Sequence, residues 1–349
     1  MTPVLIKTAI ICLADHVLPR LPVVLHHGPA GSLVVAGTEA WTRHLPDRFF
    51  GSEPRTSQEL GRWPVWRIHG LLQSWRPRVD LVAARVDRFS AVRFPPERFL
   101  CVPEWVRMVA SVKTENTFFA SSQARRNERL VKKNGLSWRV SHDPRDLTLF
   151  IERDYRPYTR ARYGEDAYLR SNGWFFSRYR DGGLVWIESD SEPVAAMLFD
   201  VYGRSLRRLA VACVRGDDSL LRTGGMSATY LACFDLARRL GCDEIDFRNC
   251  RPYVNDGLLQ VKRSWGGRLV EPDDLTHDLL IGWERTTPSV VRFFTESPLV
   301  IRKGSGFEAI QGDASLTHAD RYPSGVGRRI APVPGGAFGE WIPVRDGIP

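Results

Sequence analysis

One stretch of the sequence decides the fold, and it runs through residues 206–250 as LRRLAVACVRGDDSLLRTGGMSATYLACFDLARRLGCDEIDFRNC. Its first part, residues 206–214, is a short run of apolar and β-branched side chains, which is typical of a strand. Residues 227–240 instead carry apolar side chains at helical spacing. Residues 244–250 return to the strand pattern. We therefore expect a strand, a glycine-containing turn, a helix and a second strand in this order.

Regular elements flank this stretch on both sides. Ser121 and Gly135 delimit a polar helix, with the serine as its N-cap and the glycine as its stop. Further strands and helices are expected at 136–140, 144–163, 184–188, 194–202 and 258–265. The pattern predicts an α/β (α+β) fold in which a mixed, mostly antiparallel central sheet is flanked by helices.

This layout resembles the GNAT superfamily, in both its acetyltransferase and its Fem-ligase branches, over about Ser121 to Pro272. In acetyltransferases the glycine turn reads Gln/Arg-x-x-Gly-x-Gly/Ala, and here Arg222-Thr-Gly-Gly-Met-Ser227 matches it except at the last position. Small residues let backbone N–H groups at a helix start approach an anionic pyrophosphate closely. The resemblance implies that the donor binds at Arg222, Gly224, Gly225 and Ser227. The alternative is a plain glycine turn whose serine caps the helix.

A second resemblance lies in Val261-Lys262-Arg263-Ser264-Trp265-Gly266, which is similar to the Phe-Lys-Arg/Lys-x-Phe/Trp-Gly segment near the end of Fem-type aminoacyl-tRNA ligases. In that family the lysine sits at the acyl-transfer centre, and Lys262 is the matching position. A fixed ammonium there stabilises the oxyanion that develops when an amine attacks an ester or thioester carbonyl. The other interpretation is a lysine on a solvated helix face.

Further candidate groups precede this segment. Period-two alternation places Asp246 and Arg248 on one face of the strand 244–250. Asp246 is either a base for the acceptor ammonium, if burial raises its pKa, or the partner of Arg248 in an ion pair. In the following loop, the Tyr253 hydroxyl is a candidate acid for the leaving thiolate or ribose oxygen, unless the ring only packs on its neighbour. Arg251 in the same loop is a candidate donor-binding residue.

The net charge of +9 points to an anionic partner, and its location along the chain is informative. Between Ser121 and Arg180 there are fourteen Arg or Lys against seven Asp or Glu, interleaved with aromatic residues. This mixture is expected of surfaces that contact polyphosphates or single-stranded nucleic acid. The candidate tRNA-binding or polyanion-binding residues are Arg125, Arg126, Arg129, Lys132 and Lys133. A solvated helix face over core aromatics is the alternative.

The length of 349 residues exceeds that of one ordinary compact core. Fem-type ligases consist of two GNAT-like halves, and the length leaves room for a divergent first half. We expect a divergent N-terminal α/β, GNAT-like half at 1–115, a catalytic GNAT domain at 116–302, and a Gly/Pro-rich tail at 303–349 that lies on the surface or is partly disordered. The first half contains a Pro- and Trp-containing stretch, Arg62-Trp-Pro-Val-Trp through Trp75-Arg-Pro, which carries no recognised chemical motif; a docking surface and a plain core are both open.

Composition also limits cofactors and location. No metal and no tightly bound cofactor is expected, because the histidines and cysteines form neither an HExxH nor a CxxC pattern, and the cysteines are expected to be buried free thiols. Met1–Leu13 lacks a basic leader and a cleavage site and is expected to form a buried strand. No run approaches the roughly 18 apolar residues of a membrane span. We expect a cytoplasmic protein without membrane association; its oligomeric state stays open.

Together these features predict an enzyme that forms an amide. The lysine segment and the local positive charge favour an aminoacyl-tRNA donor and an amine of a small molecule or peptide as acceptor. An acyl-CoA-dependent N-acyltransferase is the close alternative, and either donor would be a co-substrate. A non-catalytic GNAT-fold protein that holds RNA or another polyanion is a third possibility. Because either donor carbonyl is already activated, transfer needs only placement, deprotonation and oxyanion stabilisation.

Overall fold

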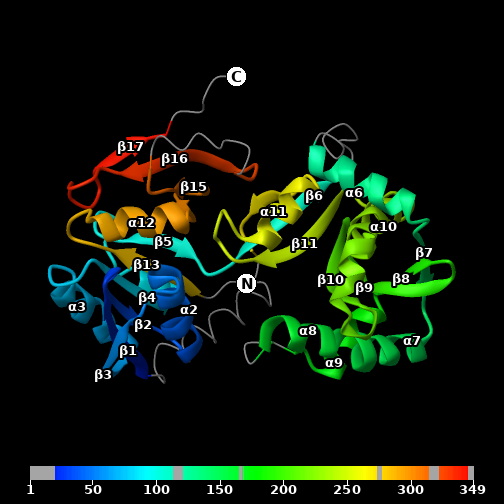
Figure 1. The fold of residues 1–349 in the computed structure, drawn as a ribbon, viewed down its shortest axis with the longest axis horizontal. Helices are drawn as coiled ribbons and strands as arrows, with labels where there is room; N and C mark the ends of the chain where they lie inside the picture. The colour runs from blue at the N-terminus through cyan, green and yellow to red at the C-terminus, as the bar shows by residue number, and fades with distance from the viewer. Residues whose placement is uncertain are drawn as a thin grey trace. The chain divides into compact units, whose positions relative to one another are not determined.

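The computed structural model describes residues 20–112, 121–164, 167, 169–272, 277–313 and 322–344. The chain divides into two compact units, whose elements are labelled in Figure 1. Unit 1 comprises the chain through Val106, Cys250–Gln260 and the chain from Leu269 onward; unit 2 comprises Arg107–Asn249 and Val261–Arg268. These bounds differ from the expected ones, since 250–260 and 269–302 belong to unit 1. The strand expected at Met1–Leu13 lies outside the described residues.

A six-stranded sheet with the order β3-β1-β2-β4-β13-β5 forms the centre of unit 1. Its neighbouring strands pair antiparallel except for β2 and β4, which are parallel. The elements of this part are β1 (Arg20–Gly28), β2 (Gly31–Ala36), α2 (Glu39–Phe50), β3 (Thr56–Pro64), α3 (Val65–Trp75), β4 (Leu81–Asp87), α4 (Arg88–Ala91), β5 (Leu100–Pro103), β13 (His277–Gly282) and α12 (Pro288–Glu296).

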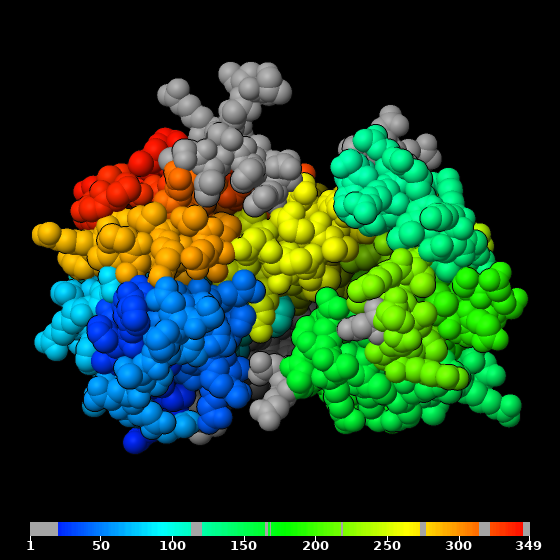
Figure 2. Space-filling model, in the orientation of Figure 1, coloured from blue at the N-terminus to red at the C-terminus, as the bar shows by residue number. Residues whose placement is uncertain are grey.

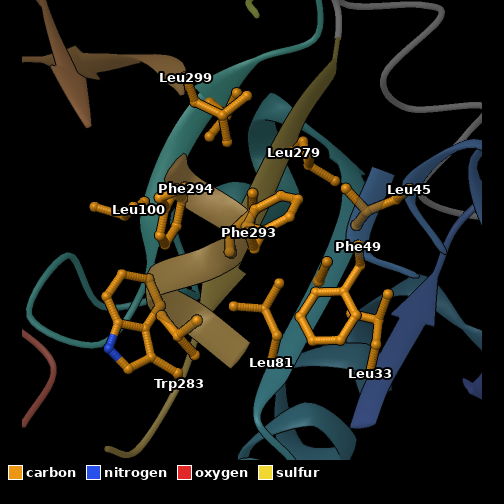
Figure 3. Close-up of a cluster of buried hydrophobic side chains, with 14 of the residues drawn as sticks. Leu33, Leu45, Phe49, Leu81, Leu100, Leu279, Trp283, Phe293, Phe294 and Leu299 are labelled. Carbon is orange, nitrogen blue, oxygen red and sulfur yellow. The ribbon is translucent and has the colours of Figure 1, made fainter. Parts of the chain in front are cut away.

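Both faces of this sheet are covered, because its central strands are apolar on both sides. Leu33 and Val35 of β2 pack into one buried cluster, and Val34 and Ala36 pack into another. Such near-continuous apolar runs are typical of strands buried on both faces. Figure 3 shows the first cluster, in which Phe293 and Phe294 of α12 lie among leucines of the sheet and Phe49 of α2.

The C-terminal part of unit 1 corrects the expectation of a surface or disordered tail at 303–349. A second sheet of four strands has the order β14-β15-β16-β17, formed by β14 (Leu299–Lys303), β15 (Gly306–Ile310), β16 (Val326–Pro332) and β17 (Trp341–Pro343). Ile310 and Ile330 are buried in the same cluster as α12, and Trp341 packs against that cluster. The high Gly and Pro content marks the turns between short strands, and the buried apolar residues fix the strands in place.

In unit 2, the main sheet has the order β12-β6-β11-β10-β9-β8-β7. From β7 to β10 the pairing is antiparallel, and β10 and β11 are parallel. The elements are β6 (Val106–Ser111), α6 (Ser122–Lys133), β7 (Ser137–Ser141), α7 (Pro144–Leu149), the π-helical turn η1 (Phe150–Tyr155), α8 (Arg156–Tyr163), α9 (Asn172–Tyr179), β8 (Gly182–Ser189), β9 (Glu192–Tyr202), β10 (Ser205–Cys213), the 3-10 turns η3 (Val214–Gly216) and η4 (Asp218–Thr223), α10 (Gly225–Arg239), β11 (Glu244–Cys250), α11 (Gly257–Ser264) and β12 (Arg268–Val270).

Helices cover both faces of the β8–β10 part of this sheet, as Figure 1 shows for α10. Ala196 and Leu198 of β9 belong to the buried cluster that α7, α8 and α9 share. The intervening Met197 contacts Cys233 of α10, whose Sγ lies 3.2 Å from the Met197 Sδ. The strand alternates between two helical layers with its period of two.

The expected fold class is therefore confirmed: the chain is mixed α/β, with mostly antiparallel sheets flanked by helices. Unit 2 also has the GNAT-like order of antiparallel strands, glycine turn, helix and parallel strand. The five described cysteines are free, and four of them are buried. None of the described helices is long and apolar enough to cross a membrane.

Candidate active site

The central feature of unit 2 is the point at which two parallel strands stop pairing. β10 pairs with β9 along its whole length, but with β11 only where Ser205–Arg207 face Glu244–Asp246. Just beyond this point the register of β10 against β9 shifts between Arg208 and Ala210, and Arg248 of β11 has a φ of 63°. A β-bulge bends its strand and ends regular pairing. The two irregularities therefore separate β10 from β11 in the middle of the sheet. We call the point after Arg207 and Asp246, where the two strands stop pairing, the parting.

Arg208 lies at this parting, and sequence reasoning missed it. Its side chain is buried, Nη2 donates to Thr229 Oγ1 at 2.9 Å, and its guanidinium carbon lies 4.2 Å from the ring centroid of Tyr230. Tyr230 in turn stacks on Trp265, with centroids 5.3 Å apart and ring planes 7° apart. The sequence did contain a signal. Neighbouring residues of a strand point to opposite faces of the sheet, so Arg207 and Arg208 lie on different faces, and helices cover both faces here.

Two polar atoms at this parting are buried without a hydrogen-bond partner among the described residues. They are Nε of Arg208 and Oδ1 of Asn249, which follows Arg248 in β11. Arg207, by contrast, is fully engaged through two hydrogen bonds to the buried carboxylate of Asp200. Because buried polar groups are normally hydrogen-bonded, each exception needs an explanation. A bound ligand would supply the missing partners.

Asp246 and Arg248 form an ion pair, which is the second of the two interpretations left open by the sequence. The Asp246 carboxylate is only 2% exposed; Oδ1 accepts the Arg248 backbone N–H at 2.7 Å, and Oδ2 lies 3.0 Å from Arg248 Nη1. Arg107 Nε is 4.0 Å from the same Oδ2. Two guanidinium groups thus lie within 4.0 Å of this carboxylate. This carboxylate also holds the N–H of the residue with positive φ, so it stabilises the bend in β11.

Lys262 is enclosed and does not lie on a solvated face. Its side chain is 2% exposed, and Nζ donates to the carbonyl oxygens of Arg248 at 2.9 Å and Asn249 at 2.7 Å. The sequence analysis named Lys262, Asp246 and Arg248 as candidate site residues, and the structure brings these three together. Both of these hydrogen bonds go to the backbone of β11 where it bends away from β10. The ammonium therefore fixes the course of the strand that carries Asn249.

The glycine turn begins α10 as expected, but its serine is no cap. Gly224 has a φ of 91° and is the N-cap residue, no side chain caps the helix, and Ser227 is the third residue of the helix, within its first turn. A Cβ on Gly224 would lie 3.2 Å from Leu130 Cγ, and a Cβ on Gly225 would lie 3.4 Å from Ala195 and Val194 of β9. Gly224 is therefore required by its backbone conformation and by a close contact, whereas Gly225 has an ordinary φ and room for a Cβ. Arg222, in the turn before them, is exposed.

The predicted Tyr253 and Arg251 belong to unit 1. Tyr253 is fully buried, its ring lies 5.8 Å from that of His44 and 4.6 Å from the Arg48 guanidinium carbon, and burial raises its pKa to about 12. Its hydroxyl has no hydrogen-bond partner among the described residues. The Arg251 guanidinium lies over Trp41 and Trp105, at 5.6 and 5.4 Å. The two residues thus form their own aromatic and cationic cluster in unit 1.

The basic helix α6 is exposed on one side and contacts the glycine turn on the other. Arg125, Arg126, Arg129, Lys132 and Lys133 are all exposed, whereas Ala124 and Val131 are buried. Figure 2 shows α6 at the surface of unit 2, in turquoise. Besides the contact of Leu130 with Gly224, the Asn134 side chain donates to the Thr223 carbonyl at 2.7 Å. The positive face therefore begins next to the start of α10.

Comparisons with known proteins give only distant structural likeness. No family model and no curated protein matches this chain. Among solved structures, FemX is similar at a TM-score of 0.39 and 14% identity, over 73% of this chain and 83% of that chain. The C-terminal domain of a putative lysylphosphatidylglycerol synthetase from Agrobacterium fabrum has a TM-score of 0.37 and 10% identity, over 74% and 80%.

A GCN5-related N-acetyltransferase from Sphaerobacter thermophilus is similar at a TM-score of 0.33 and 11% identity, over 72% of this chain and 79% of that chain. Identities and TM-scores this low do not carry an activity over to this chain.

Proposed function

We propose that the chain is an acyltransferase that moves an aminoacyl group from aminoacyl-tRNA to an amine, with the donor carbonyl bound where β10 and β11 part. The observation that carries this proposal is the pair of buried, unpartnered atoms, Arg208 Nε and Asn249 Oδ1. Leaving such an atom unpaired costs about 1–3 kcal/mol, which a bound ligand removes. An aminoacyl ester suits both atoms, because its carbonyl oxygen accepts from Arg208 and its α-amino group donates to Asn249.

In this proposal the reaction needs no covalent intermediate. The acceptor nitrogen attacks the ester carbonyl carbon, and the negative charge that develops on the carbonyl oxygen is stabilised by the Arg208 guanidinium. The ester C–O bond then breaks, and the leaving ribose oxygen takes up the proton that the nitrogen gives up. Lys262 and Asp246 act as positioning residues, since they hold the carbonyls and the N–H of the bent segment of β11.

The choice of tRNA as donor rests on the position of α6. Its exposed arginines and lysines begin beside the turn at Gly224, where Leu130 and Asn134 contact residues 223 and 224. An extended polyanion bound along α6 would therefore pass the start of α10. Phosphate contacts of this kind position a nucleic acid without reading its sequence.

A second candidate function is transfer from an acyl-CoA, and one observation favours it. The start of α10 has no side-chain cap and no acidic residue in its first turn, so its first N–H groups face no competing side chain there. The N-terminus of a helix is a natural site for the pyrophosphate of coenzyme A. Both donors would bring their acyl carbonyl to the same site, so a transfer assay with each donor distinguishes the two proposals.

The test measures label transfer from each donor. Purified protein is incubated with tRNA charged with radiolabelled amino acids, or with a mixture of labelled acyl-CoA thioesters, and a cell extract as the source of acceptors. Arg208→Gln should reduce transfer about 100-fold or more, by analogy with the loss of one oxyanion contact. Arg238→Gln, which removes an exposed arginine of α10, is the matched control and should leave transfer unchanged. Unchanged label transfer in Arg208→Gln would show that the donor carbonyl does not bind where β10 and β11 separate. Transfer from acyl-CoA and not from aminoacyl-tRNA would show that acyl-CoA is the donor.

A further inference from the structure

The described part of unit 1 contains a cationic pocket that the proposed acyl transfer does not use. It has a volume of about 350 Å³ and lies where β1, the edge strand β3 and the start of α3 meet. Its lining residues are Arg20, Arg62, Trp63, Pro64, Trp66 and Arg67. The segment Arg62-Trp-Pro-Val-Trp66, for which the sequence left a docking surface and a plain core open, thus forms most of its wall.

Positive charge is concentrated in this pocket. In the pairing of β1 with β3, Arg20 faces Pro64 and Pro22 faces Arg62, so the side chains of Arg20 and Arg62 are diagonal neighbours on one face. Arg67 follows in the first turn of α3. All three arginines are exposed, none forms an ion pair with a described residue, and no acidic residue is among the lining side chains. Like charges held this close repel one another, so an anion between them is stabilising.

Two tryptophans also line the pocket, and they differ in exposure. Trp63 is half-buried against the core of unit 1, and its indole N–H donates to the Leu60 carbonyl at 2.9 Å, so its ring is fixed. Trp66 is 44% exposed and stands on the first turn of α3. That turn carries neither a side-chain cap nor an acidic residue, so it contributes no negative charge to the pocket. An exposed indole beside guanidinium groups suits a ligand that joins a neutral planar aromatic ring to a negatively charged group.

We propose that this pocket binds a nucleoside phosphate, with the base on Trp66 and the phosphate among Arg20, Arg62 and Arg67. Guanidinium groups bind phosphate in a bidentate manner, and base–indole stacking tolerates every base. The volume falls within the range of small-ligand sites, which favours a single nucleotide unit over a flat surface such as a membrane. The nucleotide is either free or one unit of a single RNA strand. This site is separate from the parting of β10 and β11 and does not depend on acyl transfer.

The test is isothermal titration of the full chain with AMP, UMP, adenosine and inorganic phosphate. AMP and UMP should bind with similar affinity, and adenosine and phosphate alone should each bind at least tenfold more weakly than AMP. Trp66→Ala should weaken AMP binding by about fivefold to 100-fold, the range for loss of one stacking contact. Arg62→Gln with Arg67→Gln should remove most of the preference for AMP over adenosine. Arg328→Gln, an exposed arginine of β16 outside the pocket, should change nothing.

Two further titrations separate the sources of the nucleotide and the competing surface. A seven-nucleotide uridine strand that binds more tightly than UMP, with a steeper salt dependence, indicates RNA as the source; equal affinity indicates a free nucleotide. Failure of AMP and UMP to bind at millimolar concentration would overturn the proposal, as would equal affinities in Trp66→Ala and in the parent chain. Binding to anionic phospholipid vesicles that requires Trp66 and is not displaced by AMP would show a membrane-contacting surface instead. All variants should retain the parent's unfolding temperature, because the substituted side chains are exposed.

Discussion

Reversing charge on α6 is the sharpest test of a tRNA donor. Lys132 already pairs with Glu128 at 2.7 Å, whereas Arg125, Arg126, Arg129 and Lys133 have no ion-pair partner among the described residues. Four phosphate contacts give a slope of log affinity against log salt of about −2.8 to −3.6, at roughly 0.7–0.9 per contact. Raising salt fourfold should then weaken tRNA binding by about 50-fold to 150-fold. The triple variant Arg125→Glu, Arg126→Glu and Lys133→Glu keeps one contact, so its loss over the same range should be only about threefold.

The assay is fluorescence anisotropy of labelled tRNA at several salt concentrations. A matched control carries Arg145→Glu, Arg160→Glu and Arg238→Glu, which change the net charge of unit 2 equally at exposed arginines outside α6. The control should keep most of the parent's salt slope. If the α6 variant binds tRNA as tightly as the parent at every salt concentration, or if the control loses as much affinity, α6 is only a solvated face. The acyl-CoA alternative would then replace the tRNA proposal.

Three further changes test individual contacts, each by urea unfolding. Lys262→Met should lower the free energy of unfolding by about 2–5 kcal/mol, because two carbonyls of β11 lose their partner; unchanged stability would contradict the positioning role. Burial lowers the pKa of His26 from 6.5 to about 4, so the unfolded chain takes up this proton first as pH falls. Stability should therefore drop between about pH 6.5 and 4, and His26→Gln should reduce that drop. Gly224→Ala should cost about 1–2 kcal/mol because of its positive φ, whereas Gly225→Ala should stay within about 0.5 kcal/mol; equal effects would show that φ is not the cause.

The elements of unit 2 were predictable because local signals agree with tertiary structure there. The Ser121 hydroxyl caps α6, and Gly135 follows the helix with a φ of 58°. The predicted N-cap serine and stop glycine are therefore both confirmed. The chain beyond Lys303 was not predictable in the same way. Its strands pair with partners that the hydrophobic period cannot identify, and β17 contains only Trp341–Pro343. Short strands rich in Gly and Pro look like loops until their neighbours are known.

The candidate site was predictable only in part, because Arg208 and Asn249 were not among the predicted site residues and the contacts could not be predicted. Lys262, Asp246 and Arg248 were selected from a segment resemblance and an alternation, and they do lie together. The sequence could not show that the Lys262 ammonium binds backbone carbonyls, because that depends on the positive φ of Arg248. It could not show either that β10 stops pairing with β11 after Arg207, because strand separation is a property of two strands and leaves no pattern in one.

The order of strands in the first sheet of unit 1 also governs how this protein is made. β13 lies between β4 and β5, although almost two hundred residues of chain separate it from them. While the ribosome has released the chain only through β5, the sheet lacks its inner strand, and apolar side chains such as Leu100 and Val102 have no cover. Long-range pairing of this kind slows folding and leaves folding intermediates with exposed apolar surface, which are prone to aggregate. The nascent first half therefore exposes the edges of β4 and β5 to pairing with other chains until β13 emerges.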